Sequence, residues 1–353
     1  MNIYVIDGNF DIVDVIDEYT SLIWTTRYYK SGDFEIYTAA TSKHISLMKR
    51  GYFLCREDDM DDDVMHNVMV INNVQIITDV ENGNYIVVTG KCLKSIVGRR
   101  IVWEQTILSG YTEVAIRTVI NENIINPTIA SRKIANFIFA PLKNFTERID
   151  TQVTGDNIET WLEEVCKTCG IGWDVYIDNG KFVFTLWKGE DRSYSQDINP
   201  HVVFSQEFDN LLTSDYKMDS DNYKNVALVA GEGEGTERKT YAVGNATDLD
   251  RYEIYVDAGS ISTNEGEVSE AMYNAILSEK GLETLAEHGT TETFDGEIEP
   301  NTTYIINQDY FLGDIIQIIN EHGIESRSRI VEVIDSEDEN GRVVIPTYEA
   351  EVI

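Results

Sequence analysis

The stretch HNVMVINNVQIITDVENGNYIVVTGKCL, from His66 to Leu93, decides the fold class. It holds long runs of β-branched and aromatic residues, broken by turn residues at 71–73 (INN) and 81–84 (ENGN). Runs of this length with such boundaries predict antiparallel strands. Similar runs precede it, namely NIYVID, FDIVDVID, SLIWTTRYY, DFEIYTAA and YFLCRED. Together they predict an antiparallel β-barrel or sandwich.

The pattern changes after Arg100. The segment TEVAIRTVINENIINP predicts a helix that cannot extend beyond Pro127. The segment TGDNIETWLEEVCKTCG predicts a second helix, with Asp156 as N-cap, Glu159 completing a capping box and Gly170 at the C-terminal end. Its expected apolar face consists of Trp161, Leu162, Val165, Cys166 and Cys169. Next, WDVYIDNGKFVFTLW predicts a hairpin with a type I′ turn at Asn179-Gly180.

The segment VALVAGEGEGTERKTYAVGN, from Val226 to Asn245, resembles a phosphate-binding loop only superficially. Counted from Gly233, Lys239 and Thr240 fit a P-loop, but Arg238 replaces its second glycine, which must let the backbone approach phosphate. The residues that follow are typical of a strand, whereas a phosphate site needs a helix N-terminus there. The segment therefore predicts a hairpin with a glycine-rich tip.

Further strands are predicted in RYEIYVDA and from TYIINQDYF to the end of the sequence, with a helix in EVSEAMYNAILSEKGLETLAEHG between them. The chain has 28 Lys and Arg against 62 Asp and Glu, a formal net charge of −34. This charge disfavours binding to nucleic acid or anionic membrane. It is explained either by solubility or by a position beside DNA that the protein must not bind.

The sequence predicts no membrane anchor, because no apolar run approaches the ~20 residues that cross a bilayer. The acidic start MNIYVIDGNFDIVDVID is unlike a secretory signal. The few, scattered cysteines, Cys55, Cys92, Cys166 and Cys169, indicate synthesis in a reducing cytosol.

No motif supports an enzyme, a metal or a cofactor. Cys166 and Cys169 lie at the C-terminal end of a predicted helix, where the helix dipole disfavours a thiolate, so core packing is expected. The acidic run EDDMDDD at 57–63 lacks the glycine and glutamate of an EF-hand and predicts a solvated hairpin tip. Lys91, Lys94, Arg99 and Arg100 form a rare basic cluster, explained by a balanced local surface or by contact with an acidic neighbour.

Five stretches together resemble the tailed-phage hub proteins of the siphophage tail-associated type, which are similar to the trimeric baseplate hub of contractile tails. They are TTRYYKSGDFEIY (25–37), VTGKCLKSIVGRRIVW (88–103), DNYKNVALVAGEGEGTERKTYAVG (221–244), DRYEIYVDA (250–258) and DYFLGDIIQI (309–318). The resemblance implies a mainly β fold of two antiparallel β-barrels with two smaller α+β domains. On this chain it implies a first barrel at 1–105, an α+β insert at 106–205, a second barrel at 206–255 with 300–353, and a small helical insert at 256–299.

The resemblance also implies a non-enzymatic virion protein of the tail tip or baseplate, made in the host cytoplasm. It would form a homotrimeric ring with an acidic channel for DNA ejection. Its partners would be the distal tail or tail tube protein, the tape-measure protein and the tip, spike or fibre proteins. The alternatives are a cell-wall hydrolase and a carbohydrate-binding module of the tail tip. The candidate interface residues are Arg27, Lys91, Lys94, Arg99, Arg100, Gly231, Gly233 and Arg238.

Overall fold

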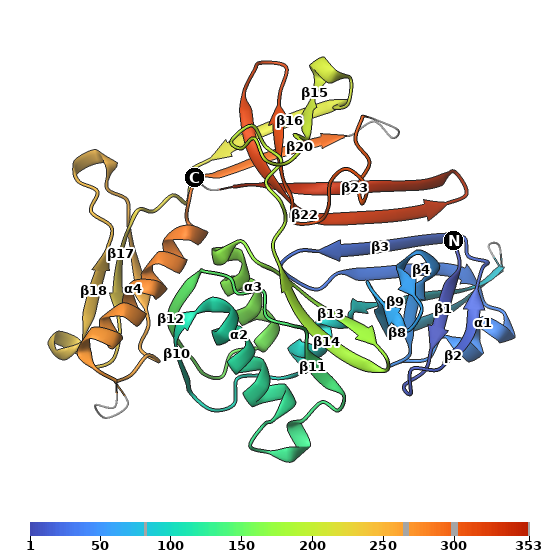
Figure 1. Cartoon of the computed structure of the whole chain (residues 1–353), viewed down its shortest axis with the longest axis horizontal. Helices are drawn as coiled ribbons and strands as arrows, with labels where there is room; N and C mark the ends of the chain where they lie inside the picture. The colour runs from blue at the N-terminus through green and yellow to red at the C-terminus, as the bar shows by residue number, and fades with distance from the viewer. Residues whose placement is uncertain (81–82, 264–267, 298–302, 352–353) are drawn as a thin grey trace.

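The computed structural model describes residues 1–80, 83–263, 268–297 and 303–351. Its largest element is an 11-stranded sheet with the order β15-β21-β22-β3-β4-β9-β8-β5-β1-β2, to which β23 is added beside β22 (Figure 1). The early strands are β1 (Ile3–Ile6), β2 (Ile12–Ile16), β3 (Ser21–Arg27), β4 (Asp33–Ala39), β5 (Phe53–Arg56), β8 (Met69–Asp79) and β9 (Gly83–Cys92). The late strands are β15 (Val203–Ser205), β21 (Ile315–Ile319), β22 (Glu325–Asp338) and β23 (Gly341–Ala350). A short helix, α1 (Ser42–Leu47), follows β4.

Strand β22 connects the early strands of the main sheet with the late ones, because it pairs with both β3 and β21. Its first part pairs with β21 through Arg329, and its second part pairs with β3 from Glu332 to Glu337. The mainly β class is therefore confirmed. The two expected barrels instead share one continuous sheet, whose strand order does not close on itself within the described ranges. The division into two barrels thus stays a prediction.

The expected turn at residues 71–73 was wrong, although the expected hairpin exists. Strand β8 continues through these residues, and the register with β9 shifts between Ile71 and Asn73, which leaves Asn72 as a bulge. Asparagine tolerates the local backbone change of a bulge as well as that of a turn. Pairing of Asp79 with Gly83 confirms the β8–β9 hairpin. Residues 81–82 of the expected turn lie outside the described residues.

The α+β insert contains helices α2 (Thr112–Ile120) and α3 (Ile158–Cys169). They accompany the ribbon of β10 (Thr106–Tyr111) and β12 (Arg148–Val153) and a five-stranded sheet. That sheet consists of β11 (Phe137–Phe139), β14 (Lys181–Trp187), β13 (Gly172–Asp178), β7 (Val64–Met65) and β6 (Met60–Asp61). Its last two strands form a hairpin with an exposed turn at Asp62–Asp63, as expected for the acidic run.

Helix α3 shows the expected apolar face, since Trp161, Leu162, Val165 and Cys166 are buried. The expected N-cap was wrong. Asn157 caps the helix by accepting from the backbone N–H of Glu159 at 3.0 Å. The carbonyl of Asp156 instead accepts a bond from Val102 N–H.

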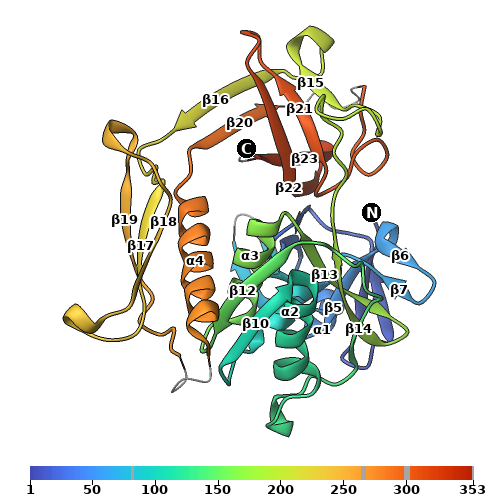
Figure 2. The ribbon, with the colours of Figure 1, turned by 60° about the vertical axis from the view of Figure 1, so that its left-hand side comes forward.

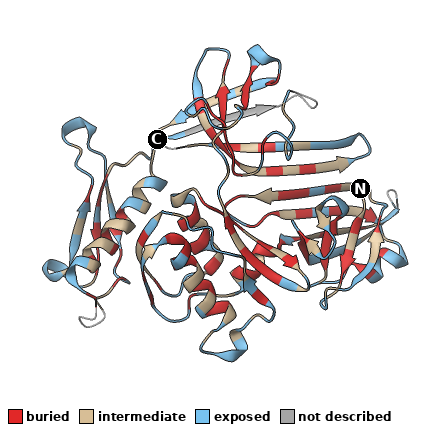
Figure 3. Ribbon diagram, viewed as in Figure 1, coloured by how far each residue is buried: buried red, intermediate tan, exposed pale blue. Residues whose placement is uncertain are grey.

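Both turn predictions in this insert were correct. Gly170 ends α3 with a left-handed φ of 62°. Asn179 and Gly180 have φ values of 48° and 68°, as a type I′ turn requires. Figure 3 shows buried residues concentrated where these helices meet the sheets. This core contains Tyr28, which directly follows β3, as well as Trp173 of β13.

A smaller unit projects on a two-stranded arm made of β16 (Thr213–Asp219) and β20 (Thr291–Glu297) (Figure 2). It contains the sheet β18-β17-β19, covered on one face by helix α4 (Glu270–Glu287). The strands are β17 (Val226–Ala230), β18 (Thr240–Val243) and β19 (Glu253–Asp257). The predicted hairpin is confirmed as β17–β18, but it does not lie in the sheet of β21–β23, where it was expected. The apolar face of this hairpin packs on α4. The predicted domain boundary at residue 255 had assigned the hairpin and this helix to different domains.

Helix α4 turns several carboxylates toward the insert. Burial, followed by the charges of Glu283 and Asp150, raises the pKa of Glu279 to about 6. Burial also raises the pKa of Glu164 on α3. Because the folded-state pKa of Glu279 is raised, its ionisation opposes folding increasingly as the pH rises from about 4.5 to 6.

We therefore expect Glu279→Gln to stabilise the protein at pH 7 by about 1 kcal/mol, after allowance for partial solvent screening. The advantage should shrink as the pH falls from 7 toward 5. Urea denaturation over this pH range measures it, with Glu237→Gln, an exposed acid of the same unit, as the control. A stabilisation that does not depend on pH would contradict this explanation.

Candidate assembly surface

The outer face of the main sheet presents one continuous row of residues across six strands. The row follows the strand register through Val343, Ser336, Ile23, Glu35, Thr89 and Asn73. Residues paired in register project to the same face of a sheet. Val343 and Ile23 are 45% and 38% exposed, so the apolar part of the row faces solvent.

Alternation along the strands explains this face. In β3, Leu22 and Trp24 point into the core while Ile23 points outward. In β4, Phe34 and Ile36 are buried on either side of exposed Glu35. The face is therefore a consequence of strand periodicity, and it is uncovered in the single chain.

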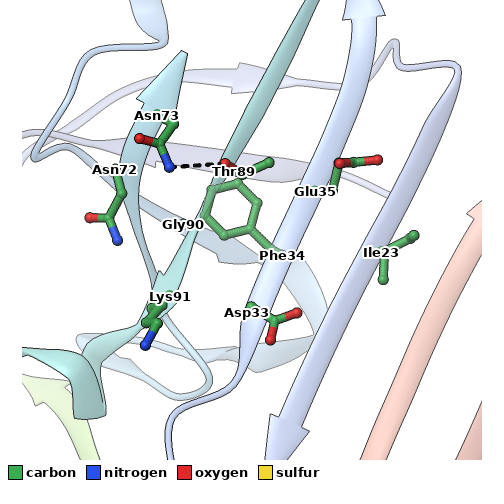
Figure 4. Close-up of a pocket in the computed structure, with 9 residues that line it drawn as sticks. All are labelled: Ile23, Asp33, Phe34, Glu35, Asn72, Asn73, Thr89, Gly90 and Lys91. Atoms are coloured by element: carbon green, nitrogen blue, oxygen red, sulfur yellow. Dashed lines mark hydrogen bonds between the residues drawn. The ribbon is translucent and has the colours of Figure 1, made fainter. Parts of the chain in front are cut away.

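Part of this face is an open hollow of about 430 Å³. Figure 4 shows the residues that line it, with Asp33, Glu35 and Lys91 on the outer face and the ring of Phe34 buried on the opposite face of β4. Asn73 donates to the hydroxyl of Thr89 at 3.3 Å across β8 and β9. The bulged Asn72 also lines the hollow, so the misjudged turn residues are part of this surface.

Of the predicted interface residues, Lys91 lies on this face. It is exposed, lines the hollow and is paired in register with Asp33 of β4. Arg27 lies at the end of β3, where it binds the carboxylates of Asp33 and Glu332 and the carbonyl of Ser31. Arg27 therefore ties β3 to β22 within the subunit.

The sequence suggested that Lys94 contacts a partner. The structure shows that Lys94 is only 3% exposed and is not available for such a contact. Its ammonium group donates to the carbonyls of Arg27 and Tyr28. It also lies 5.1 Å and 5.5 Å from the ring centres of Trp173 and Trp187. Burial lowers the pKa of Lys94. Its role is internal, between the first sheet and the insert.

The glycine-rich tip closes on its own unit. A Cβ on Gly231 would lie 2.1 Å from the hydroxyl of Tyr273 on α4, so the close approach of this glycine is to its own chain. Gly233 has a φ of 98°, which favours glycine. Arg238 donates to the carbonyl of Gly231 at 2.9 Å and binds Asp257. Arg99 is exposed and Arg100 half-buried, both away from this tip.

The prediction from sequence missed Ile23, Ser336 and Val343. The alternation in SLIWTTR was the available signal for Ile23, since it places this residue opposite Leu22 and Trp24. No local signal pairs β22 with β3, because about 300 residues separate them.

The cysteine pair of α3 has the environment of core residues. Burial raises the pKa of both Cys166 and Cys169, which disfavours the nucleophilic thiolate. Over the described ranges, no three His, Cys, Asp or Glu side chains are grouped to hold a metal ion. In that same part of the chain, no helix has both the length and the apolar character of a membrane span.

Known structures share this fold over their full length. A tail protein from Neisseria meningitidis MC58 superimposes with a TM-score of 0.56 at 14% identity, covering 99% of this chain and 96% of that one. Prophage tail protein gp18 from Listeria monocytogenes EGD-e gives 0.56 at 12% identity, with 100% and 95% covered. The 43 kDa tail protein of prophage MuSo2 from Shewanella oneidensis gives 0.55 at 12% identity, with 100% and 98% covered. At these identities the likeness establishes the fold alone.

No curated protein matches the sequence. Residues 2–348 match the family described as Siphovirus ReqiPepy6 Gp37-like protein. The resemblance to tailed-phage tail proteins is thereby confirmed across nearly the whole chain. The chain belongs to the Siphovirus ReqiPepy6 Gp37-like protein family of phage tail proteins.

Proposed function

We propose that this chain is a structural, non-enzymatic hub at the tail tip or baseplate of a phage or phage-like particle. The observation that carries the proposal is the family match over residues 2–348, together with a fold shared end to end with phage tail proteins. The hub joins the distal tail or tail tube protein to the tip, spike or fibre proteins. The tape-measure protein is a further partner.

In this proposal three copies form a ring. The outer face of the main sheet supports the idea, because six neighbouring strands present a continuous surface with Ile23 and Val343 exposed on it. Exposed apolar residues on a broad, regular surface favour contact with another protein. The division of the chain into two barrels and two inserts belongs to the same proposal.

The proposed ring encloses a channel through which DNA leaves the particle. The net charge of −34 supports this idea, because a negative wall repels phosphate and lets DNA slide.

Deletion of the gene from the phage or prophage that encodes the chain tests the proposal. We expect particles with missing or incomplete tails, restored when the full chain is supplied from a plasmid. Electron microscopy with a gold-labelled antibody should then place the protein at the distal end of the tail. Normal, infective tails without the chain would refute the proposed role.

A further inference from the structure

Four arginines from three segments of the chain gather on one surface, which we call the arginine patch: Arg50, Arg99, Arg100 and Arg132. Arg50 and Arg99 are exposed, and Arg100 and Arg132 are half-buried. Arg100 donates through Nε to the carbonyl of Arg132 at 2.7 Å. Arg100 also donates to the carbonyl of Arg99 at 3.0 Å.

The patch lacks the ion pairs that most other described cations of the chain make. Within the described ranges, none of the four arginines has a carboxylate within 4.0 Å, although acidic residues outnumber basic ones by 62 to 28. Burial, followed by the positive charges of Arg100 and Arg50, lowers the pKa of Arg99. Burial and Arg100 lower that of Arg132, and Glu104 offsets this in part. Like charges held together without partners are unfavourable in the single chain.

Exposed apolar groups lie beside these charges. Trp103 is 54% exposed, and the guanidinium of Arg132 lies 4.9 Å from the centre of its ring. Ile101 is 39% exposed, and its carbonyl accepts from Arg132 at 2.6 Å. Tryptophan and arginine are the residues most enriched at the energetic centres of protein interfaces.

The backbone below the patch is held in place. The carbonyl of Gly98 accepts from the side chain of Asn157 at 2.7 Å, and that of Arg100 accepts from Ile158 N–H at 3.1 Å. Both bonds tie the patch to the start of α3. A surface fixed in this way loses little conformational entropy when a partner binds.

We propose that the arginine patch, with Trp103 and Ile101, docks onto an acidic face of a second copy of this chain. The inference deepens the proposed function, because it names a surface at which copies in the ring meet. Charge complementarity selects the occupant, since a copy with a net charge of −34 offers many unpaired carboxylates. Asp61, Asp62 and Asp63 at the β6–β7 turn are exposed examples. A basic patch that meets an acidic face elsewhere on the same molecule makes a heterologous contact, the kind of contact that forms a ring when its rotation closes.

The test compares two double charge reversals that change the net charge equally. Arg50→Glu/Arg99→Glu alters the patch at two exposed side chains without a hydrogen bond or ion pair among the described residues. Lys143→Glu/Lys181→Glu reverses two exposed lysines outside the patch, which also have no ion pair in that part of the chain. Circular dichroism and thermal melting check that both variants fold. Sedimentation equilibrium of the full chain from about 1 to 100 µM measures self-association.

We expect the wild type to associate, the patch variant to associate at least about 30-fold more weakly, and the lysine variant to stay within about threefold of the wild type. Trp103→Ala should weaken association about tenfold without a change of charge. Equal association of the two double variants, or a wild type that stays monomeric throughout, would overturn the inference. Binding of inorganic polyphosphate by a monomeric wild type, lost in the patch variant, would instead assign the patch to a phosphate polymer. None of these results affects the tail role, which the deletion tests separately.

Discussion

Tyr28→Ala should lower the free energy of unfolding by about 3–5 kcal/mol, which is the cost of removing a large aromatic side chain from a core. Tyr28 has no exposed surface and lies between three parts of the molecule. A Cβ on Gly172 of the insert would lie 2.1 Å from its ring, and a Cβ on Gly313, before β21, would lie 2.4 Å from it. Trp187 packs edge-on against the same ring, with centres 5.2 Å apart.

The hydroxyl of Tyr28 makes a separate contribution. It lies 3.2 Å from the carbonyl oxygens of Gly170 and Trp187 and accepts from Gly189 N–H at 3.3 Å. Tyr28→Phe keeps the ring and should cost about 1–2 kcal/mol. Tyr194→Ala, at a tyrosine that is 47% exposed, is the control for losing a tyrosine. Chemical denaturation of the four proteins measures the differences, and a Tyr28→Ala loss below about 1 kcal/mol would refute the central role of this residue.

Asp335→Ala should destabilise the protein by about 3 kcal/mol, because it leaves a buried cation without one of its partners. Asp335 of β22 is 7% exposed and Arg56 of β5 is 8% exposed. The carboxylate accepts from Arg56 at 2.5 Å and from Arg342 at 2.6 Å and 2.9 Å. Strands β5 and β22 are far apart in the sheet order, so this ion pair joins two distant parts of the main sheet.

Two further variants test that explanation. Glu339→Ala removes an exposed carboxylate from the β22–β23 turn and should change the stability by no more than about 0.5 kcal/mol. Arg56→Ala/Asp335→Ala should cost clearly less than the sum of the single changes, because neither charge is then left behind. Additive costs in denaturant melts would show that the two side chains do not act as a pair.

Local sequence signals predicted local structure well. Runs of β-branched and aromatic residues predicted the strands, and the Asn179-Gly180 pair predicted its turn, because both signals depend on neighbouring residues. The INN segment was misjudged because asparagine favours bulges and turns alike. The cap of α3 was misplaced by one residue, since Asp156 and Asn157 are both good caps, and contacts with the distant residues Gly98 and Val102 fix the backbone here.

Contacts distant in sequence account for the rest. Nothing near Lys94 signals its burial, because the two tryptophans that surround it follow about 80 and 90 residues later. The open face of the main sheet depends on the pairing of β3 with β22. Arg99 and Arg100 were singled out from sequence as a basic cluster, but Arg50 and Arg132 join them only after folding.

A cryo-electron microscopy map of the tail end of the particle that carries this chain tests the central claim most directly. The account predicts three copies around the tail axis at the distal end, with acidic side chains along the channel and the arginine patch of each copy against its neighbour. A distal tail that contains no copy of the chain, or copies confined to the capsid, would contradict the account.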